Sequence, residues 1–279
     1  MNEGVRDESG RANRRAAPPL NAGQQFVIFS LVLCLSSCSR RPPTHGTAFL
    51  VALDTNYLAS GQNYEQALER AREVLCRRLD NFGVGCFIEP EAQGRLLIKV
   101  PPLKNDDLSA VRQVMSKPGL LEFRMVHPNN EDLVRAGTNE PGFELLKEIR
   151  RFPDGKTSFF SILVKKQPER GLTGKYIRRA SVLNDPVSGA PGIVFEFNAE
   201  GARLFELITT DYQPAGDRSY RLAIVLDGEL RSAPRITGVI SGGQGVINGN
   251  FTAREAFELA NILARPLEVP VRVVEERTF

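Results

Sequence analysis

The chain has 279 residues, of which 42% are hydrophobic and 25% charged, and its formal net charge is +3. This size allows one or two packed domains, and a near-neutral charge without a basic stripe argues against a nucleic-acid-binding protein. Its two histidines, His45 and His127, lie far apart in the sequence, which argues against a histidine-rich metal site.

Residues 1–38 have the organisation of a signal peptide. A polar leader precedes an apolar run, Phe26 to Leu35, which is about as long as a signal-peptide core and about half of a membrane-spanning helix. The run ends in Leu35-Ser-Ser-Cys38, which resembles the lipobox of bacterial lipoproteins. We therefore expect acylation of Cys38 and attachment to a membrane surface. The alternatives are a poor transmembrane anchor or a core helix with a chance cysteine. The long leader also fits a true start codon downstream of Met1.

The segment that follows, residues 39–46, is predicted to be a short tether. Beyond it the chain holds two cysteines, Cys76 and Cys86. In an oxidising cell envelope these two residues would either form a disulfide or remain two separate thiols, one on a helix and one on a strand.

Residues 47–126 alternate between strand and helix patterns. Asn63 is the expected N-cap of the first helix, and Gly83 is expected to end it. The order of elements is βαββαβ, the ferredoxin-like arrangement, with its last strand closing the sheet. The expected elements are strand 47–54, helix 64–82, strands 84–90 and 95–100, helix 106–116 and strand 120–126.

A stretch rich in Pro, Asn, Glu and Gly, residues 127–155, marks a boundary, with one short helical patch at residues 143–150. Strand patterns outnumber helices beyond it, and the two types are interspersed, so the predicted fold class is α+β. Asp227-Gly228 is a strong hairpin signal, and Thr252 with Glu255 predicts a capping box. The expected elements are strands 159–164, 177–183, 193–197, 222–226, 246–249 and 269–274 and helices 199–211 and 253–264.

No residue pattern predicts a catalytic, cofactor-binding or metal site. Gly242-Gly-Gln-Gly245 precedes a strand pattern and so lacks the helix N-terminus that a phosphate loop requires. Ser232 has no partner signature for a catalytic base. An enzyme is therefore disfavoured, and no cofactor is expected.

Glycines punctuate the short strands between residues 228 and 249. Glycine permits positive φ and close backbone approach. This pattern predicts tight turns in a small sheet, an open sheet edge or groove that holds an extended polypeptide, or both together.

The run Leu222-Ala-Ile-Val-Leu-Asp-Gly-Glu-Leu-Arg-Ser-Ala-Pro-Arg-Ile236 resembles the signature of the large periplasmic domain of SecD and SecDF, accessory membrane components of the bacterial Sec translocase. The similarity continues through residues 191–205, 240–252, 255–263 and 273–278. It implies a ferredoxin-like base, residues 47–130 plus 266–279, and an inserted head subdomain, residues 131–265, that contacts the translocating preprotein.

Two departures from that family limit what the resemblance implies. Leu53-Asp-Thr-Asn56 stands where the family normally has a Leu-Arg-Gly-Gly-like stretch. The family's membrane helices with their charged residues do not follow within the sequence, which runs to Phe279. The expectation is therefore contact with polypeptide, without coupling to a proton gradient.

The sequence thus predicts a non-enzymatic lipoprotein on the periplasmic side of the cell envelope that assists protein export. Its expected partners are unfolded or translocating polypeptide, Sec translocase components and a membrane through its lipid. An envelope scaffold that keeps the fold without a translocase role is the alternative. The candidate contact residues are apolar side chains that border the glycine bends: Phe195, Phe197, Ile236, Ile240 and Phe251.

Overall fold

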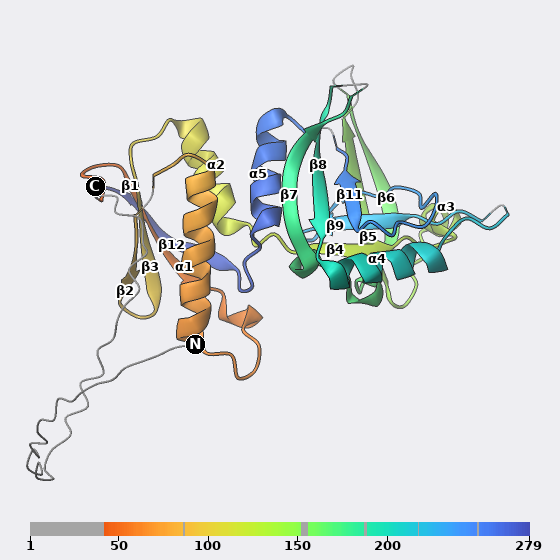
Figure 1. Ribbon diagram of the computed structural model, residues 1–279, viewed down its shortest axis with the longest axis horizontal. Helices are drawn as coiled ribbons and strands as arrows, with labels where there is room; N and C mark the ends of the chain where they lie inside the picture. The colour runs from red at the N-terminus through yellow and green to blue at the C-terminus, as the bar shows by residue number, and fades with distance from the viewer. Residues whose placement is uncertain (1–41, 86, 152–155, 187–188, 217, 250) are drawn as a thin grey trace, which may run out of the picture. The chain divides into compact units, whose positions relative to one another are not determined.

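The computed structural model (Figure 1) describes residues 42–279 except 86, 152–155, 187–188, 217 and 250. The predicted signal peptide and lipidation site at Cys38 lie outside the described residues, and so does Cys86 of the candidate disulfide. Cys76 donates a hydrogen bond from Sγ to Asp80 Oδ2 at 3.7 Å. Lipidation and the disulfide therefore stay predictions.

The first layer is an antiparallel sheet with the strand order β12-β1-β3-β2. Two helices pack on one face of this sheet (Figure 1), because alternate residues of β1 and β3 and the apolar stripes of both helices share one core. The side chain of Asn63 caps the first helix, as predicted. The elements are β1 (Thr47–Leu53), α1 (Tyr64–Asn81), β2 (Phe87–Glu91), β3 (Arg95–Val100), α2 (Asn105–Ser116) and β12 (Val271–Thr278).

The predicted closing strand of this sheet is wrong. Strand β4 (Leu121–Met125) pairs instead with β9 (Leu222–Leu226), and β12 occupies the edge beside β1. The reason is a contact between distant parts of the chain. Asp227 accepts hydrogen bonds from the N–H groups of Gly119 and Leu120 at 2.9 and 2.8 Å, so the turn that follows β9 places the start of β4 beside that strand.

The remaining strands form three small sheets of order β10-β9-β4, β11-β8-β7 and β5-β6. The helix predicted at residues 143–150 is wrong, because these residues belong to strand β5. Figure 1 shows α5 alongside β7. The bounds are α3 (Asn130–Ala136), β5 (Phe143–Arg151), β6 (Thr157–Lys165), β7 (Ile177–Asn184), β8 (Pro191–Phe197), α4 (Ala199–Asp211), β10 (Glu229–Ser232), β11 (Gln244–Ile247) and α5 (Ala253–Ala264), with 3-10 turns at Thr55–Tyr57, Glu169–Gly171 and Gly174–Tyr176.

Four phenylalanine rings form the centre of a second hydrophobic core, separate from the core that β1 and β3 share with α1 and α2. Phe197 contacts the rings of Phe123, Phe195 and Phe205 at centroid distances of 5.4, 5.1 and 5.5 Å. This cluster lies between β4, β8 and α4, and aromatic pairs in such edge-to-face arrangements add to the energy of burial. A Cβ at Gly245 would lie 2.4 Å from the Phe195 ring, so glycine is required there for β11 to approach β8.

A buried arginine on α1 connects the carboxyl ends of α2 and α5. The side chain of Arg78 on α1 is fully buried and donates hydrogen bonds only to backbone carbonyl oxygens. Its guanidinium lies at the carboxyl ends of both α2 and α5, where a positive charge is favourable. The acceptors are the carbonyls of Val114, Lys117, Pro118, Ile262 and Arg265, at 2.6 to 3.4 Å.

Candidate functional site

The five candidate contact residues do not form one surface. Phe195, Phe197 and Ile236 are only 2%, 4% and 6% exposed, as members of the second core. Ile240 is 38% exposed, and its N–H donates to Thr209 Oγ1 on α4 at 3.0 Å. Phe251 is half-buried and lines a surface hollow. Of the five, Ile240 and Phe251 are therefore the residues that present surface to a partner in this conformation.

Among the described residues from β4 to α5, the two-stranded ribbon β5-β6 carries the most exposed large apolar side chains. Leu145, Ile149 and Phe159 expose 52%, 57% and 65% of their surface. The register pairs Ile149 with Phe159 across the ribbon, and Leu145 lies four residues from Ile149 on the same face. We call these three residues the ribbon face.

The opposite face of the ribbon is packed. Leu146, Ile162 and Val164 contact a core with residues of β9 and β10. Carboxylates lie on this packed side: Glu144 pairs with Arg124, and Glu148 lies 4.0 Å from Arg221 Nη2. The alternation therefore leaves the ribbon face apolar, with Lys147 beside it. Among the described residues of the ribbon, no carboxylate lies on that side.

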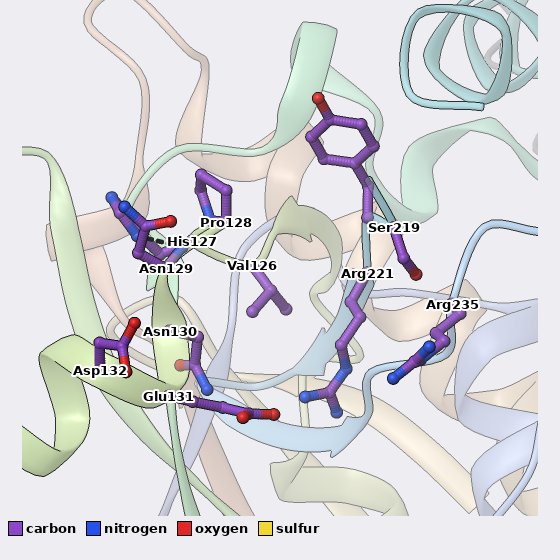
Figure 2. Close-up of a pocket in the computed structure, with 11 residues that line it drawn as sticks. Val126, His127, Pro128, Asn129, Asn130, Glu131, Asp132, Ser219, Arg221 and Arg235 are labelled. Atoms are coloured by element: carbon purple, nitrogen blue, oxygen red, sulfur yellow. Dashed lines mark hydrogen bonds between the residues drawn. The ribbon is translucent and has the colours of Figure 1, made fainter. Parts of the chain in front are cut away.

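A trough runs along α3 beside the ribbon. One hollow of about 820 Å³ contains Phe159, Phe160 and Ile162 in its lining, and a second of about 300 Å³ lies next to it. Four residues line both hollows, so the two are continuous. Figure 2 shows the arginines on one side of the second hollow and the α3 residues on the other. The shared residues are Asn130, Glu131, Arg221 and Arg235.

His127 at the edge of this trough has a structural role. Its Nδ1 accepts the N–H of Asn129 at 3.0 Å, so Nε2 carries the proton that faces Glu140 Oε2 at 3.0 Å. The imidazole ring also contacts Phe143 at a centroid distance of 4.6 Å. Both ring nitrogens are thus engaged with neighbours in the protein, which disfavours a role as a general base.

A third hollow, of about 380 Å³, lies on the other side of the ribbon, between β5 and β10. We call it the seam hollow. Its lining is mixed, because apolar side chains alternate with charged ones. The lining residues are Leu146, Lys147, Ile149, Gly228, Glu229, Leu230, Arg231, Gly249, Phe251 and Glu255.

Sequence reasoning missed the ribbon because Phe143, Leu146 and Ile149 recur every three residues, which is typical of a helix. The available signal was Pro153-Asp-Gly155, a turn sequence directly before the strand pattern that begins near Phe159. Such a turn between two apolar runs indicates a hairpin.

Within residues 42–279, outside the undescribed gaps, no cluster of three or more His, Cys, Asp or Glu side chains has the arrangement of a metal site. None of the helices in the same part of the chain has both the length and the apolar character that a membrane crossing requires.

Comparison with known proteins gives these surfaces a context. Residues 146–266 match the SecDF P1 head subdomain. The translocase subunit SecD of Magnetococcus marinus is 34% identical over 220 residues, 76% of this chain and 39% of that protein. SecD of Endomicrobium trichonymphae is 34% identical over 256 residues, 84% of this chain and 51% of that protein. The chain therefore spans about two fifths to a half of the length of these relatives.

Solved structures show the same similarity. A structure of SecDF, described as a membrane component that enhances protein export, aligns with a TM-score of 0.61 and 28% identity over 83% of this chain and 100% of that one. SecDF in its super-membrane-facing form aligns with a TM-score of 0.63 and 27% identity over 85% of this chain and 31% of that one.

The match to the P1 head subdomain includes most of the ribbon and the seam hollow. It begins at Leu146, within β5, and extends beyond α5. Strand β4 and helix α3 lie before it, although β4 pairs with β9 inside it. The matched region thus contains Ile149 and Phe159 of the ribbon face, whereas Leu145 and α3, which forms one wall of the trough, lie before it.

Proposed function

We propose that this chain is a non-enzymatic accessory in protein export, which contacts unfolded or translocating polypeptide, or Sec translocase components, on the periplasmic side of the inner membrane. The similarity to SecD and to the SecDF P1 head subdomain supports this role. The observation that carries it is the ribbon face, an exposed apolar surface within or directly beside the matched region. Ile240 and Phe251 belong to the proposed contact set as well.

A mixed surface of this kind fits a partner without a defined fold. Exposed apolar side chains bind the apolar side chains of an unfolded chain, and the polar side chains around them permit release into water. Lys147 and the charges of the trough add electrostatic contacts of both signs. Little sequence selectivity is expected from such a surface.

We also propose that the domains of this chain are arranged as in SecD and SecDF. The sheet of order β12-β1-β3-β2 with α1 and α2 supports a ferredoxin-like base in residues 47–130 and 266–279, with β4 contributed to the head. The head would comprise residues 131–265. We further propose that Cys38 is acylated and holds the chain on a membrane. Mass spectrometry of the mature N-terminal peptide tests this point, since an unmodified Cys38 contradicts it.

The ribbon face is tested by replacing Leu145, Ile149 and Phe159 with serine in the full chain. Because all three side chains are exposed, the fold should be retained while the affinity for a urea-denatured secretory precursor, diluted into buffer, falls about tenfold or more. Fluorescence anisotropy of the labelled precursor measures the affinity. Unchanged affinity would contradict the proposed surface.

The matched control replaces three exposed apolar residues outside the ribbon with serine. These are Tyr57, Leu183 and Val246, which expose 56%, 47% and 40% of their surface. This control variant should bind the precursor as the parent does. The alternative role, an envelope scaffold, predicts that the parent chain itself does not bind the precursor and does not co-purify with Sec components.

A further inference from the structure

Residues 128–139 leave the fold and return to it at one point. The residues that flank this segment, His127 and Glu140, are joined by a hydrogen bond of 3.0 Å between the imidazole Nε2 and the carboxylate. The N–H of His127 also donates to Leu163 O at 2.8 Å, which holds this point against β6. Surface loops of this length whose ends lie close together are frequently functional. We call residues 128–139 the flap.

The flap packs loosely on the rest of the protein. It consists mainly of α3, and no residue of α3 is buried or belongs to a hydrophobic core of the described chain. A polar contact ties its start to β6, because Asn130 Oδ1 accepts the N–H of Leu163 at 2.7 Å. Gly137, with a φ of 65°, ends the helix near the other end of the flap. Segments with few buried apolar contacts move at a low cost in free energy.

Opposite charges face each other across the trough. Glu131 projects from the flap, and Arg221 and Arg235 lie on the far wall. Figure 2 shows the carboxylate of Glu131 pointing toward the guanidinium of Arg221. Among the described side chains of the trough, no ion pair joins Glu131 to either arginine in this conformation. The neighbouring Asp132 instead pairs with Arg135 of the same helix at 3.5 Å.

The far wall places two like charges side by side. Arg221 and Arg235 lie directly opposite each other in an antiparallel bridge, an arrangement that is destabilising unless a negative charge is near. Glu148 lies 4.0 Å from Arg221 Nη2, whereas Arg235 is exposed and forms no ion pair among the described residues. Arg235 therefore gains most from a carboxylate that moves toward it, and Glu131 is the flap residue placed to supply one.

The trough is continuous with the proposed contact surface. Phe159 belongs to the ribbon face and also lines the larger hollow, together with Phe160 and with Val134 of the flap. A client segment that binds the ribbon face through apolar side chains therefore reaches the trough directly. Closure of the flap over such a segment would also exclude water from the charges at the rim, and electrostatic attraction strengthens as water is removed.

We propose that the flap is a clamp, which closes over a client segment in the trough and is held shut by an ion pair between Glu131 and Arg235. This inference rests on the proposed function and adds a conformational step to it. In the open conformation described here the two side chains are apart, and closure brings them together. Such a clamp retains a client of any sequence, because it acts on the rate of dissociation and makes no contact that depends on the client's side chains.

The test measures how fast the labelled, urea-denatured precursor dissociates from the full chain after excess unlabelled precursor is added. Glu131→Arg and Arg235→Glu each place like charges across the trough, so each should raise the dissociation rate about fivefold. The variant with both substitutions exchanges the two charges and should return to within about twofold of the parent rate. This restoration requires the two residues to meet. A double variant that dissociates as fast as the single variants overturns the clamp.

The matched control is Asp132→Arg, a charge reversal at the next residue of α3. It changes the net charge and the first turn of the helix as Glu131→Arg does, but Asp132 pairs with Arg135 within the helix. This control should change the dissociation rate by less than about twofold. Equal effects of the two reversals would assign the change to the charge of the flap and contradict a specific pair. Glu131, Asp132 and Arg235 are all exposed, so the variants should keep the fold, which circular dichroism checks.

Hydrogen–deuterium exchange separates this inference from the proposed function. In the parent chain, the amides of α3 should exchange more slowly when the precursor is bound, because closure reduces local opening of the flap. In the Glu131→Arg variant this protection should be lost while the precursor still binds. Binding of the precursor to the parent without protection of α3 overturns the clamp alone. Failure of the parent chain to bind the precursor overturns the proposed function and the clamp with it.

Discussion

Substitution of Arg78 by methionine is expected to lower the free energy of unfolding by about 3–5 kcal/mol, the range for removal of one member of a buried charged network. The side chain is fully buried and donates to five carbonyl oxygens. Methionine fills a similar volume but donates nothing, so all five carbonyls lose this donor, although those of Pro118 and Ile262 each keep a backbone N–H partner. Each buried unsatisfied group costs about 1–3 kcal/mol. Urea denaturation followed by circular dichroism measures the loss.

The charge of Arg78 is part of this effect. Burial lowers the pKa of Arg78 to about 10, and the negative charge of Asp227 opposes that shift. The guanidinium therefore remains protonated at neutral pH, where it stabilises the carboxyl ends of α2 and α5. Lysine keeps the charge but has a single donor atom, so Arg78→Lys should recover only part of the stability.

The adjacent Arg77 is exposed and provides the matched control. Arg77→Met should change the free energy of unfolding by no more than about 0.5 kcal/mol, as is usual for surface positions. A loss for Arg78→Met no larger than that of the control would show that its five hydrogen bonds contribute nothing to the fold.

Asp227 is expected to show a large difference between two substitutions. Its Oδ1 accepts the N–H groups of Gly119 and Leu120, and its backbone has a φ of 52°. Alanine removes both hydrogen bonds and tolerates this left-handed conformation poorly, so Asp227→Ala should cost about 2–4 kcal/mol. Asparagine keeps an acceptor and adopts positive φ readily, so Asp227→Asn should cost much less.

The pH dependence of this pair has a defined sign. Burial raises the pKa of Asp227 above its ordinary value of 3.8, against the opposing effect of the Leu120 and Gly119 N–H groups and of the charges of Lys117 and Arg78. Its Oδ2 is buried without a hydrogen-bond partner, which agrees with that direction. A carboxyl with a raised pKa binds its proton more tightly in the folded state than in the unfolded state.

The parent chain should therefore gain stability relative to Asp227→Asn as the pH falls from neutral through the raised pKa towards 3.8. Urea denaturation of both proteins across this window measures the difference. The opposite trend, in which the parent loses stability relative to the asparagine variant on acidification, would mean that the N–H groups outweigh burial.

Local signals in the sequence predicted α1, α2, α4 and α5, although they missed α3 and wrongly predicted a helix at the position of β5. Asn63 caps α1, the capping box of Thr252 and Glu255 starts α5, and Asp227-Gly228 forms the turn between β9 and β10. Each of these features depends on residues within one turn of each other. The short range of such interactions is the reason that a single sequence reveals them.

Features that depend on distant residues were not predictable in the same way. The partner of β4 is set by Asp227, far along the chain, and no local pattern identifies it. The candidate site shows the same limit. Phe195 and Phe197 are aromatic residues of the kind expected in a contact surface, but their position between β4 and α4 buries them. The exposure of Leu145 and Phe159 depends on which face of the ribbon packs against the core, and no local pattern identifies that face.

Photocrosslinking in cells tests the contact between this chain and its clients most directly. A photoreactive phenylalanine at position 149 or 159, on the ribbon face, should give adducts with secretory precursors during export. The same residue at position 183, also an exposed apolar site but on β7, should give few. Precursor adducts from position 183 with none from positions 149 and 159 would contradict the assignment of polypeptide contact to the ribbon.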